Sequence, residues 1–309
     1  MKKSDLHVIA IISNPRRYRS RVELWEKFKA NMLDIHEANL HVVELQFGDR
    51  PAEITIGNGQ AYHMQTFEEI WHKENMINCA IAKLPQDWKY LAWIDADVEF
   101  VRRDWAAETI HMLQHHYFVQ MWEHAIDLGP SGQTMNTHRS FMAFYSDNQR
   151  YFPPKNYLSW HPGFAWAARR EAIDFVGGLI DIGILGSGDR HMAGAMIGQV
   201  DKTYNSRVHP NYVKALNTWQ ARCERFIRRD VGFVPGTILH SWHGKKKDRQ
   251  YADRWKILVE NQFDPEIDIK RDWQGIYQLN DHGDERSIRL RDDIRKYFST
   301  RNEDSIDLI

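Results

Sequence analysis

Short apolar runs alternate with amphipathic stretches along much of the chain. Leu6–Ile12 and Leu40–Phe47 are apolar runs of strand length, and residues 22–32 between them repeat apolar side chains at helical spacing. Strands that alternate with helices are typical of an α/β fold with a mostly parallel sheet. We therefore expect an α/β protein in which helices flank such a sheet.

The most informative apolar run is Trp88–Phe100, which breaks into Asp95-Ala96-Asp97. It predicts a strand that is buried on both faces and carries two aspartates at its carboxyl end, the edge where open α/β sheets bind ligands. Strand alternation places Asp95 and Asp97 on one side, with their Cα atoms about 7 Å apart. A hard divalent cation that carries a sugar-nucleotide diphosphate would satisfy both carboxylates. A surface turn after a strand is the alternative, because aspartate is common in turns.

The first strand leads into a polar turn, Ser13-Asn14-Pro15, and then into the basic run Arg16–Arg21. A strand followed by a polar turn and a helix opens a nucleotide-binding α/β unit. Arginines at such a turn could hold a diphosphate, and a solvated helix start explains them equally well. The turn has neither a GxGxxG pattern nor a Walker lysine loop, which excludes a dinucleotide site and a P-loop here.

A helix is predicted over Phe67–Leu84, and its entry, Trp71–Asn75, is unusually polar for a helix that faces a core. Lys73 and Asn75 in this entry could contact a nucleotide. Helix capping and solvation explain the same residues, so both interpretations stay open.

The middle of the chain is less regular. Residues 123–155 have no clean period and contain several glycines and prolines, so we expect irregular structure with a strand around Arg139–Tyr145. His161–Ala168 is predicted to be a small, aromatic strand. Gly163 within it indicates the close approach of a ligand or another backbone segment.

Two late stretches carry further candidate chemistry. Asp189 follows a glycine-rich turn and begins a predicted helix, where it could act as a base or only cap the helix. His240 and His243 follow a short strand at a spacing that can bind a metal, although most such pairs do not. Lys246, in the run of three lysines that follows, could clamp a phosphate. From about residue 250 onward the chain is charged and predicted to be mostly helical.

Composition narrows the class of protein. A chain of 309 residues with 42% hydrophobic and 27% charged content can form a soluble globular protein with a sizeable core. The net charge of -1 argues against binding nucleic acid mainly by bulk charge, but it leaves room for local basic patches. Cys79 and Cys223 provide neither a disulfide framework nor zinc spacing, which favours a reducing compartment. No apolar run approaches the ~18 residues of a membrane span, and the first residues lack a signal-peptide cleavage site, so we expect a cytoplasmic protein.

The order of these features resembles the glycosyltransferases of the GT-A fold over roughly residues 5–250, especially their family-2-like and galactosyltransferase-like members. WIDADVEF is similar to their DxD strand, GFAWAARREAIDFVGGL with GSGD to their acceptor-side block, and HSWHGKKKDR to their late metal-ligand segment. The resemblance implies a Rossmann-like, mostly parallel sheet flanked by helices. It divides the GT-A domain, 1–250, into a nucleotide-sugar half (1–120) and an acceptor half (121–250). A mostly helical C-terminal extension (251–309) follows.

For the chemistry, the resemblance implies transfer of a sugar from a nucleotide-sugar, such as UDP-glucose, to an acceptor hydroxyl. Asp97, His240 and His243 would hold Mn²⁺ or Mg²⁺, and the cation would assist the departure of the diphosphate. Asp189 would accept the proton of the acceptor hydroxyl, with inversion. Gly188 replaces the acid that precedes this base in the family, a departure that bears on the stereochemistry. The implied donor-binding residues are Ser13, Asn14, Arg16, Lys73, Asn75, Asp95, Gly163 and Lys246, with Asp95 on the ribose or on a metal-bound water.

The acceptor is implied by a further resemblance. The Trp71–Asn75 entry, the GFAWAARREA block and the YFSTRNEDS tail resemble phage glycosyltransferases related to those that glucosylate hydroxymethylated bases in DNA. This resemblance implies a modified DNA base as acceptor, and the host cytoplasm as the location. Such a base must be flipped out or unpaired, and the basic runs RRYRSR, RCERFIRR and KKK could contact the strand. A glycan or a small molecule is the alternative acceptor and would need none of these runs.

Two other classes of protein compete with a glycosyltransferase. A phosphotransferase of the haloacid-dehalogenase type would place its DxD on the first strand, with Thr or Val two residues after the second aspartate, where this chain has Glu99. A sugar- or nucleic-acid-binding module without turnover would not need both the acidic residues and the histidine pair.

Overall fold

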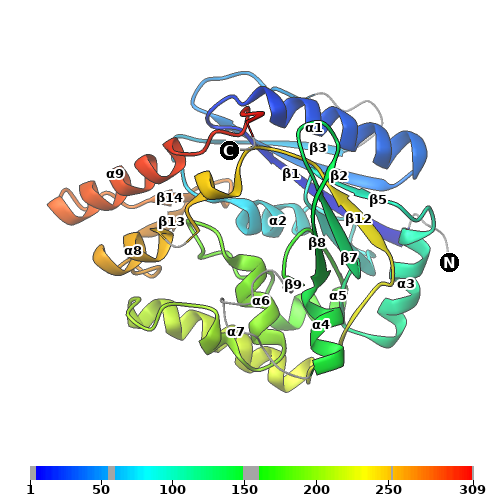
Figure 1. Cartoon of the computed structure of the whole chain (residues 1–309). Coiled ribbons are helices and arrows are strands. Elements are labelled where there is room, and N and C mark those ends of the chain that lie inside the picture. Colours follow the sequence, from blue (N-terminus) through cyan, green and yellow to red (C-terminus); the bar gives the residue numbers. More distant parts are fainter. Residues whose placement is uncertain (1–4, 55–59, 149–159, 252, 308–309) are drawn as a thin grey trace.

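The computed structural model describes residues 5–54, 60–148, 160–251 and 253–307. Its centre is a seven-stranded sheet in the order β11-β6-β10-β4-β1-β2-β3 (Figure 1). Only β10 runs antiparallel to its neighbours in this sheet, so the predicted α/β fold with a mostly parallel sheet flanked by helices is confirmed. The strands are β1 Leu6–Ser13, β2 Asn39–Phe47, β3 Gln60–Thr66, β4 Tyr90–Ile94, β6 Phe118–Gln120, β10 Ala165–Arg169 and β11 Val231–Phe233.

Alternate residues of the central strands face two separate hydrophobic cores. Ile9 and Trp93 belong to one core, and Val8 and Ala92 belong to the other. This alternation explains why the central strands read as continuous apolar runs, since both faces of the sheet are covered. The first core is covered by α2 Lys73–Ile81, α4 Phe141–Asn148, α5 Arg170–Val176, α6 Gly188–Met196 and α7 Pro210–Phe226, and the second by α1 Arg19–Ala30 and α3 Trp105–His115.

A second sheet, in the order β5-β12-β7-β8-β9, positions the candidate chemistry. β12 runs antiparallel to β5 and pairs His240 with Val98, the residue after Asp97. The backbone N–H of Ser241 donates to the carbonyl of Asp97 at 2.9 Å, which extends this pairing to the aspartate itself. The strands are β5 Val98–Phe100, β7 His124–Leu128, β8 Thr134–Ser140, β9 Trp160–His161 and β12 Thr237–His240.

Three sequence-based predictions of local structure need correction. The strand expected around Arg139–Tyr145 is wrong for most of its length, because β8 ends at Ser140 and α4 begins at Phe141. The helix expected over Phe67–Leu84 begins only at Lys73. The sequence also predicts a short strand at Glu53–Ile56 within the glycine-containing loop after Phe47; this range lies partly outside the described residues, and Glu53 and Ile54 are not in a strand.

The C-terminal part contains two helices, α8 Asp253–Glu260 and α9 Glu285–Ser299, which lie side by side (Figure 1). Between them is a hairpin that the sequence did not predict, β13 Ile269–Arg271 with β14 Tyr277–Leu279. Short helical turns occupy Asn31–Ile35, Val200–Lys202 and Lys246–Arg249. Among the described helices, none combines the length and the apolar character that crossing a membrane requires.

Candidate active site

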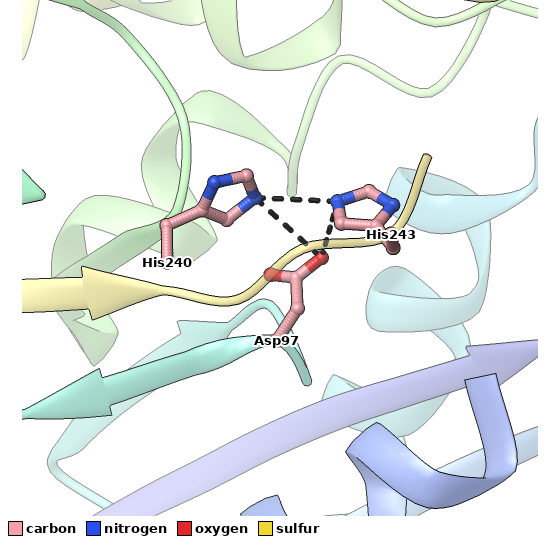
Figure 2. A group of neighbouring side chains, drawn as sticks. All are labelled: Asp97, His240 and His243. Carbon is pink, nitrogen blue, oxygen red and sulfur yellow. Dashed lines mark hydrogen bonds and ion pairs between the residues drawn. The ribbon is translucent and has the colours of Figure 1, made fainter. Parts of the chain in front are cut away.

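Asp97, His240 and His243 converge where β5 and β12 lie side by side (Figure 2). The Nε2 atoms of His243 and His240 lie 3.1 Å and 3.8 Å from Oδ2 of Asp97, and 3.2 Å from each other. The second carboxylate oxygen, Oδ1 of Asp97, is buried and has no hydrogen-bond partner among the described residues. One carboxylate and two imidazoles with their ligand atoms within 4.8 Å fit a divalent cation.

A buried carboxylate behind the cluster orients His240. Nδ1 of His240 lies 2.9 Å from Oδ1 of Asp127, which turns Nε2 toward Asp97. Oδ2 of Asp127 accepts hydrogen bonds at 2.5 Å from both His138 and Lys246. Burial alone would raise the pKa of Asp127, but these hydrogen bonds outweigh it and hold that pKa below its usual range. A carboxylate on the outer nitrogen of a metal-binding imidazole fixes both its tautomer and its ring orientation.

Arg249 contacts both ring nitrogens of His243. A guanidinium nitrogen of Arg249 lies 2.8 Å from Nε2 and 3.1 Å from Nδ1 of the imidazole. Burial, followed by the charge of Arg249, lowers the pKa of His243 to about 4. The imidazole is therefore neutral at neutral pH, which is the state that binds a metal.

Lys73 joins the two other acidic residues of the site. Its Nζ lies 2.5 Å from Oδ1 of Asp95 and 3.0 Å from Oδ2 of Asp189. Lys73 is only 7% exposed, so the alternative that this polar helix entry is solvated is wrong. The Oδ1 atom of Asp189 is buried without a hydrogen-bond partner in the described chain, so it can still accept one. The N-cap of α6 is Ser187 rather than Asp189, so capping does not account for this carboxylate.

Glu74 supplies a carboxyl group that the sequence analysis missed. A Cβ atom at position 188 would lie only 2.3 Å from Cδ of Glu74, so the Glu74 carboxyl group fills the space of the absent side chain at Gly188. Nε1 of Trp71 donates to Oε2 of Glu74 at 3.1 Å. Burial, followed by the charge of Asp189, raises the pKa of Glu74 to about 8. A carboxyl group from α2 therefore occupies the space beside Gly188, next to Asp189.

Gly163 lies at a close approach between two of these groups. A Cβ atom there would lie 3.0 Å from the His161 ring and 3.1 Å from Oδ2 of Asp189. The neighbours are side chains rather than the ligand or backbone segment that the sequence predicted, and Gly163 lies between β9 and β10 rather than within a strand.

Lys73, the three aspartates Asp95, Asp97 and Asp189, and the two histidines His240 and His243 line one cavity of about 190 Å³. The cavity is bordered by Ile11 and Ile12 of β1 and by Asp95 after β4, so it lies at the carboxyl edge of the parallel strands, as expected. Six cationic side chains line it against three carboxylates. The cationic residues are Arg21, Lys73, Arg190, Arg249, Arg254 and Arg301, and the carboxylates are Asp95, Asp97 and Asp189.

Among these cations the sequence analysis named Lys73 and included Arg21 in its first basic run, but it missed Arg190, Arg249, Arg254 and Arg301. Arg254 and Arg301 come from the part that was treated as a C-terminal extension, and only the tertiary fold brings them here. Arg21 belongs to the first basic run and is bound by Glu303 at 2.5 Å and 2.9 Å.

Five predicted donor-binding residues are not part of this cavity lining. Asn14 bonds to Tyr18 and Glu53, and Arg16 pairs with Glu69 at 2.7 Å. Asn75 holds the β13–β14 hairpin, because its amide donates to the carbonyl of Gly275 and accepts from the backbone of Tyr277. Lys246 binds Asp127 and lines a neighbouring cavity of about 440 Å³. Ser13 ends β1 beyond the two isoleucines that line the cavity.

No protein-family model matches this chain, and no curated protein does. Several solved structures align with parts of it at low identity. A protein described as a nucleotide-diphospho-sugar transferase from Desulfovibrio desulfuricans G20 aligns over 84% of this chain and 95% of its own, with 11% identity and a TM-score of 0.38. The 4-diphosphocytidyl-2C-methyl-D-erythritol synthase of Anaerococcus prevotii DSM 20548 aligns over 76% and 90%, with 13% identity and a TM-score of 0.35.

The catalytic domain of Drosophila β1,4-galactosyltransferase 7, bound to xylobiose, aligns over 61% of this chain and 58% of its own, with 12% identity and a TM-score of 0.31. A mutant of that enzyme has been solved with manganese, UDP-Gal and xylobiose. At these identities and TM-scores the similarities assign neither an activity nor a substrate to this chain.

Proposed function

We propose that this protein is a metal-dependent glycosyltransferase that moves a sugar from a nucleotide-sugar to an acceptor hydroxyl. The observation that carries the proposal is the pairing of two sites in one cavity. Asp97, His240 and His243 form a candidate metal site, and Asp189 is a separate carboxylate with a free oxygen. Transfer from a diphosphate needs both functions, since charge builds up on the leaving group while a proton leaves the acceptor.

On the donor side, the two imidazoles and the Asp97 carboxylate would hold Mn²⁺ or Mg²⁺, and imidazole ligands favour Mn²⁺. When bound, the cation would neutralise charge on the departing diphosphate. Arg21 and Arg249 line the same cavity and would donate hydrogen bonds to phosphate oxygens. Asp95 would bind the donor ribose, with Lys73 holding its carboxylate in place.

On the acceptor side, the free Oδ1 of Asp189 would accept the proton of the attacking hydroxyl. The acceptor oxygen then bonds to the anomeric carbon, and the bond from that carbon to the diphosphate breaks, with its electron pair leaving on the nucleoside diphosphate. Lys73 holds Oδ2 of Asp189 at 3.0 Å and so fixes the orientation of the carboxylate. A single displacement of this kind inverts the anomeric centre.

The proposal is tested by incubating the protein with a panel of UDP-sugars and Mn²⁺ and measuring the release of UDP. We expect release that needs the metal and falls at least about 100-fold in Asp97→Ala. Asp174→Ala, at an exposed aspartate of α5, is the matched control and should keep full activity. Release that is unchanged in Asp97→Ala contradicts the proposal. Metal-independent binding without turnover would indicate a binding module, and phosphate release from monoesters would indicate a phosphotransferase.

For the acceptor, we propose a hydroxymethylated base in DNA, on the strength of the sequence resemblance. The basic runs give this acceptor little support, because Arg16 and Arg21 are paired with Glu69 and Glu303, and Arg222 donates to the carbonyl of Val176. The DNA acceptor is tested by incubating the protein and the donor with oligonucleotides that contain or lack 5-hydroxymethylcytosine and then measuring the mass of each oligonucleotide. We expect a gain of one sugar mass only where the modified base is present. Transfer only to a glycan or small molecule would remove the DNA acceptor and leave the transferase standing.

A further inference from the structure

The cations of the cavity divide into those with a clear partner and those without one. Lys73 is held by Asp95 and Asp189, and Arg21 by Glu303. Arg249 contacts His243 beside the candidate metal site. Arg190 donates to the carbonyl of Lys202 at 3.4 Å. Two arginines, Arg254 and Arg301, remain to be explained.

Arg254 lies against the loop that leads to Asp189. A side chain at Gly186, three residues before the aspartate, would place its Cβ atom 3.2 Å from Nη1 of Arg254. The guanidinium therefore lies close to the backbone of this loop. The guanidinium carbon lies 5.2 Å and 6.0 Å from the ring centres of Tyr251 and Trp255. Its Nε is buried and has no hydrogen-bond partner in the described part of the chain. Arg254 thus lines the cavity beside the loop that leads to Asp189, and the described part of the chain supplies no hydrogen-bond acceptor for its Nε.

Arg301 approaches the same loop from the C-terminal end of the chain. Its guanidinium carbon lies 5.3 Å from the ring centre of Trp71. The Trp71 ring in turn packs against the loop, because a Cβ atom added at Gly186 would lie 3.9 Å from it. Nη1 of Arg301 lies 3.7 Å from Glu303, which Arg21 already binds, and Nε of Arg301 is buried without a partner among the described residues.

Ser187, which lines the same cavity and lies two residues before Asp189 in the sequence, completes the set. Its Oγ is also buried without a described partner, and its backbone has a φ of 88°. A serine in this left-handed conformation is strained, which is common where a loop is held for binding. A buried charged donor without a partner costs free energy, so the set of three donors calls for an acceptor of hydrogen bonds that also carries negative charge.

We propose that Arg254, Arg301 and Ser187 form a subsite for an oxyanion, a carboxylate or a phosphate, which the acceptor carries close to its reacting hydroxyl. This inference rests on the proposed function, and it names the class of acceptor. The donor diphosphate has its own partners in the metal site, Arg21 and Arg249. The planar fork of a guanidinium matches the geometry of carboxylate and phosphate oxygens. The oxyanion can belong to a small phosphorylated or carboxylated hydroxy compound, or to a phosphodiester beside a modified base.

The direct test is calorimetric titration with methyl phosphate, in the presence of Mn²⁺ and saturating UDP. We expect binding that UDP does not displace, and affinity at least about tenfold weaker in Arg254→Met. Arg254→Lys should recover part of it, and Arg207→Met, at an exposed arginine outside the cavity, is the matched control. Failure of methyl phosphate to bind, or its displacement by UDP, would overturn the subsite. Failure of UDP itself to bind would contradict the proposed donor site. The oxyanion subsite would then be judged by the binding of methyl phosphate alone.

A second test separates the sources of the oxyanion by transfer to paired acceptors. The pairs are glycerol with glycerol 3-phosphate, glucose with glucuronate, and 5-hydroxymethylcytidine with the same base in an oligonucleotide. We expect kcat/KM at least about tenfold higher for the charged member of one or more pairs, and loss of this preference in Arg254→Met. Equal use of neutral acceptors, or a charge requirement that falls on the donor sugar instead, overturns the inference.

Discussion

Nζ of Lys73 lies 3.0 Å from Oδ2 of Asp189, although 116 residues separate the two along the chain. The same ammonium group contacts Asp95, so one buried cation links the carboxylate proposed for the donor to the carboxylate proposed as base. Two carboxylates at this distance from one cation would repel each other without it. Lys73 therefore has a structural and an electrostatic role that a solvated lysine does not have.

Replacing Lys73 should destabilise the protein through the charges it leaves behind. Lys73→Met leaves the side chains of Asp95 and Asp189, which are 26% and 20% exposed, without their shared partner. Removal of one partner of a buried pair costs about 3–5 kcal/mol, and the residual exposure here should lower the cost to about 2–4 kcal/mol. Urea unfolding of the two proteins measures this difference in the free energy of unfolding. The double variant Lys73→Met/Asp189→Asn should recover part of the loss, and equal stability of Lys73→Met and the wild type would be incompatible with the contact.

Replacing Asp189 should affect transfer and spare the metal. Asp189→Asn keeps the size of the side chain but cannot accept the proton, so transfer should fall about 10²- to 10⁴-fold. Mn²⁺ affinity, measured by calorimetry, should stay within about threefold, since Asp189 is not one of the three candidate ligands. A parallel loss of metal binding would mean that Asp189 belongs to the cation site rather than acting as the base.

Asp127 should control metal affinity without touching the metal. Its carboxylate binds Nδ1 of His240, and loss of such a partner lowers metal affinity by about 10- to 100-fold. Asp127→Asn should show this loss in a Mn²⁺ titration, while Asp174→Asn on the exposed face of α5 should not. Unchanged affinity in Asp127→Asn would show that His240 is oriented by other contacts.

Glu74 should make stability fall as the pH rises. Its pKa is raised from 4.5 to about 8 in the folded protein, so unfolding releases a proton between these two values. Stability contributed by the protonated group is therefore complete below pH 4.5 and is lost toward pH 8, by up to about 1.4 kcal/mol per pH unit. Glu74→Gln cannot ionise, so its stability relative to the wild type should increase over this range. Parallel stability curves for the two proteins would show that Glu74 titrates normally.

The sheet and the separate parts of the candidate metal site could be predicted from sequence because each leaves a local pattern, whereas the meeting of Asp97 with the two histidines was implied only by the family resemblance. β1, β2 and β4 face a core on both sides and so appear as apolar runs, and Asp97 follows the last of them directly. The spacing of His240 and His243 places both imidazoles after a single short strand. These signals need no knowledge of which segments meet in space.

The remaining parts depend on contacts between distant segments. The β7–β8 hairpin was missed because Asp127 and His138, buried polar residues that bond to each other, interrupt its apolar pattern. Glu74 takes the place of a side chain at Gly188 only after α2 packs against the start of α6. Arg254 is distant along the chain from the Gly186 loop that it approaches, and no local feature marks it as part of the site.

A crystal of the protein grown with Mn²⁺ and UDP, with anomalous diffraction data recorded at the manganese edge, tests the central claim most directly. We expect one strong anomalous peak in direct contact with a carboxylate oxygen of Asp97 and with Nε2 of His240 and His243, with the UDP phosphates beside it. A manganese peak bound elsewhere, with these three side chains still in contact with one another and no ion among them, would contradict the claim.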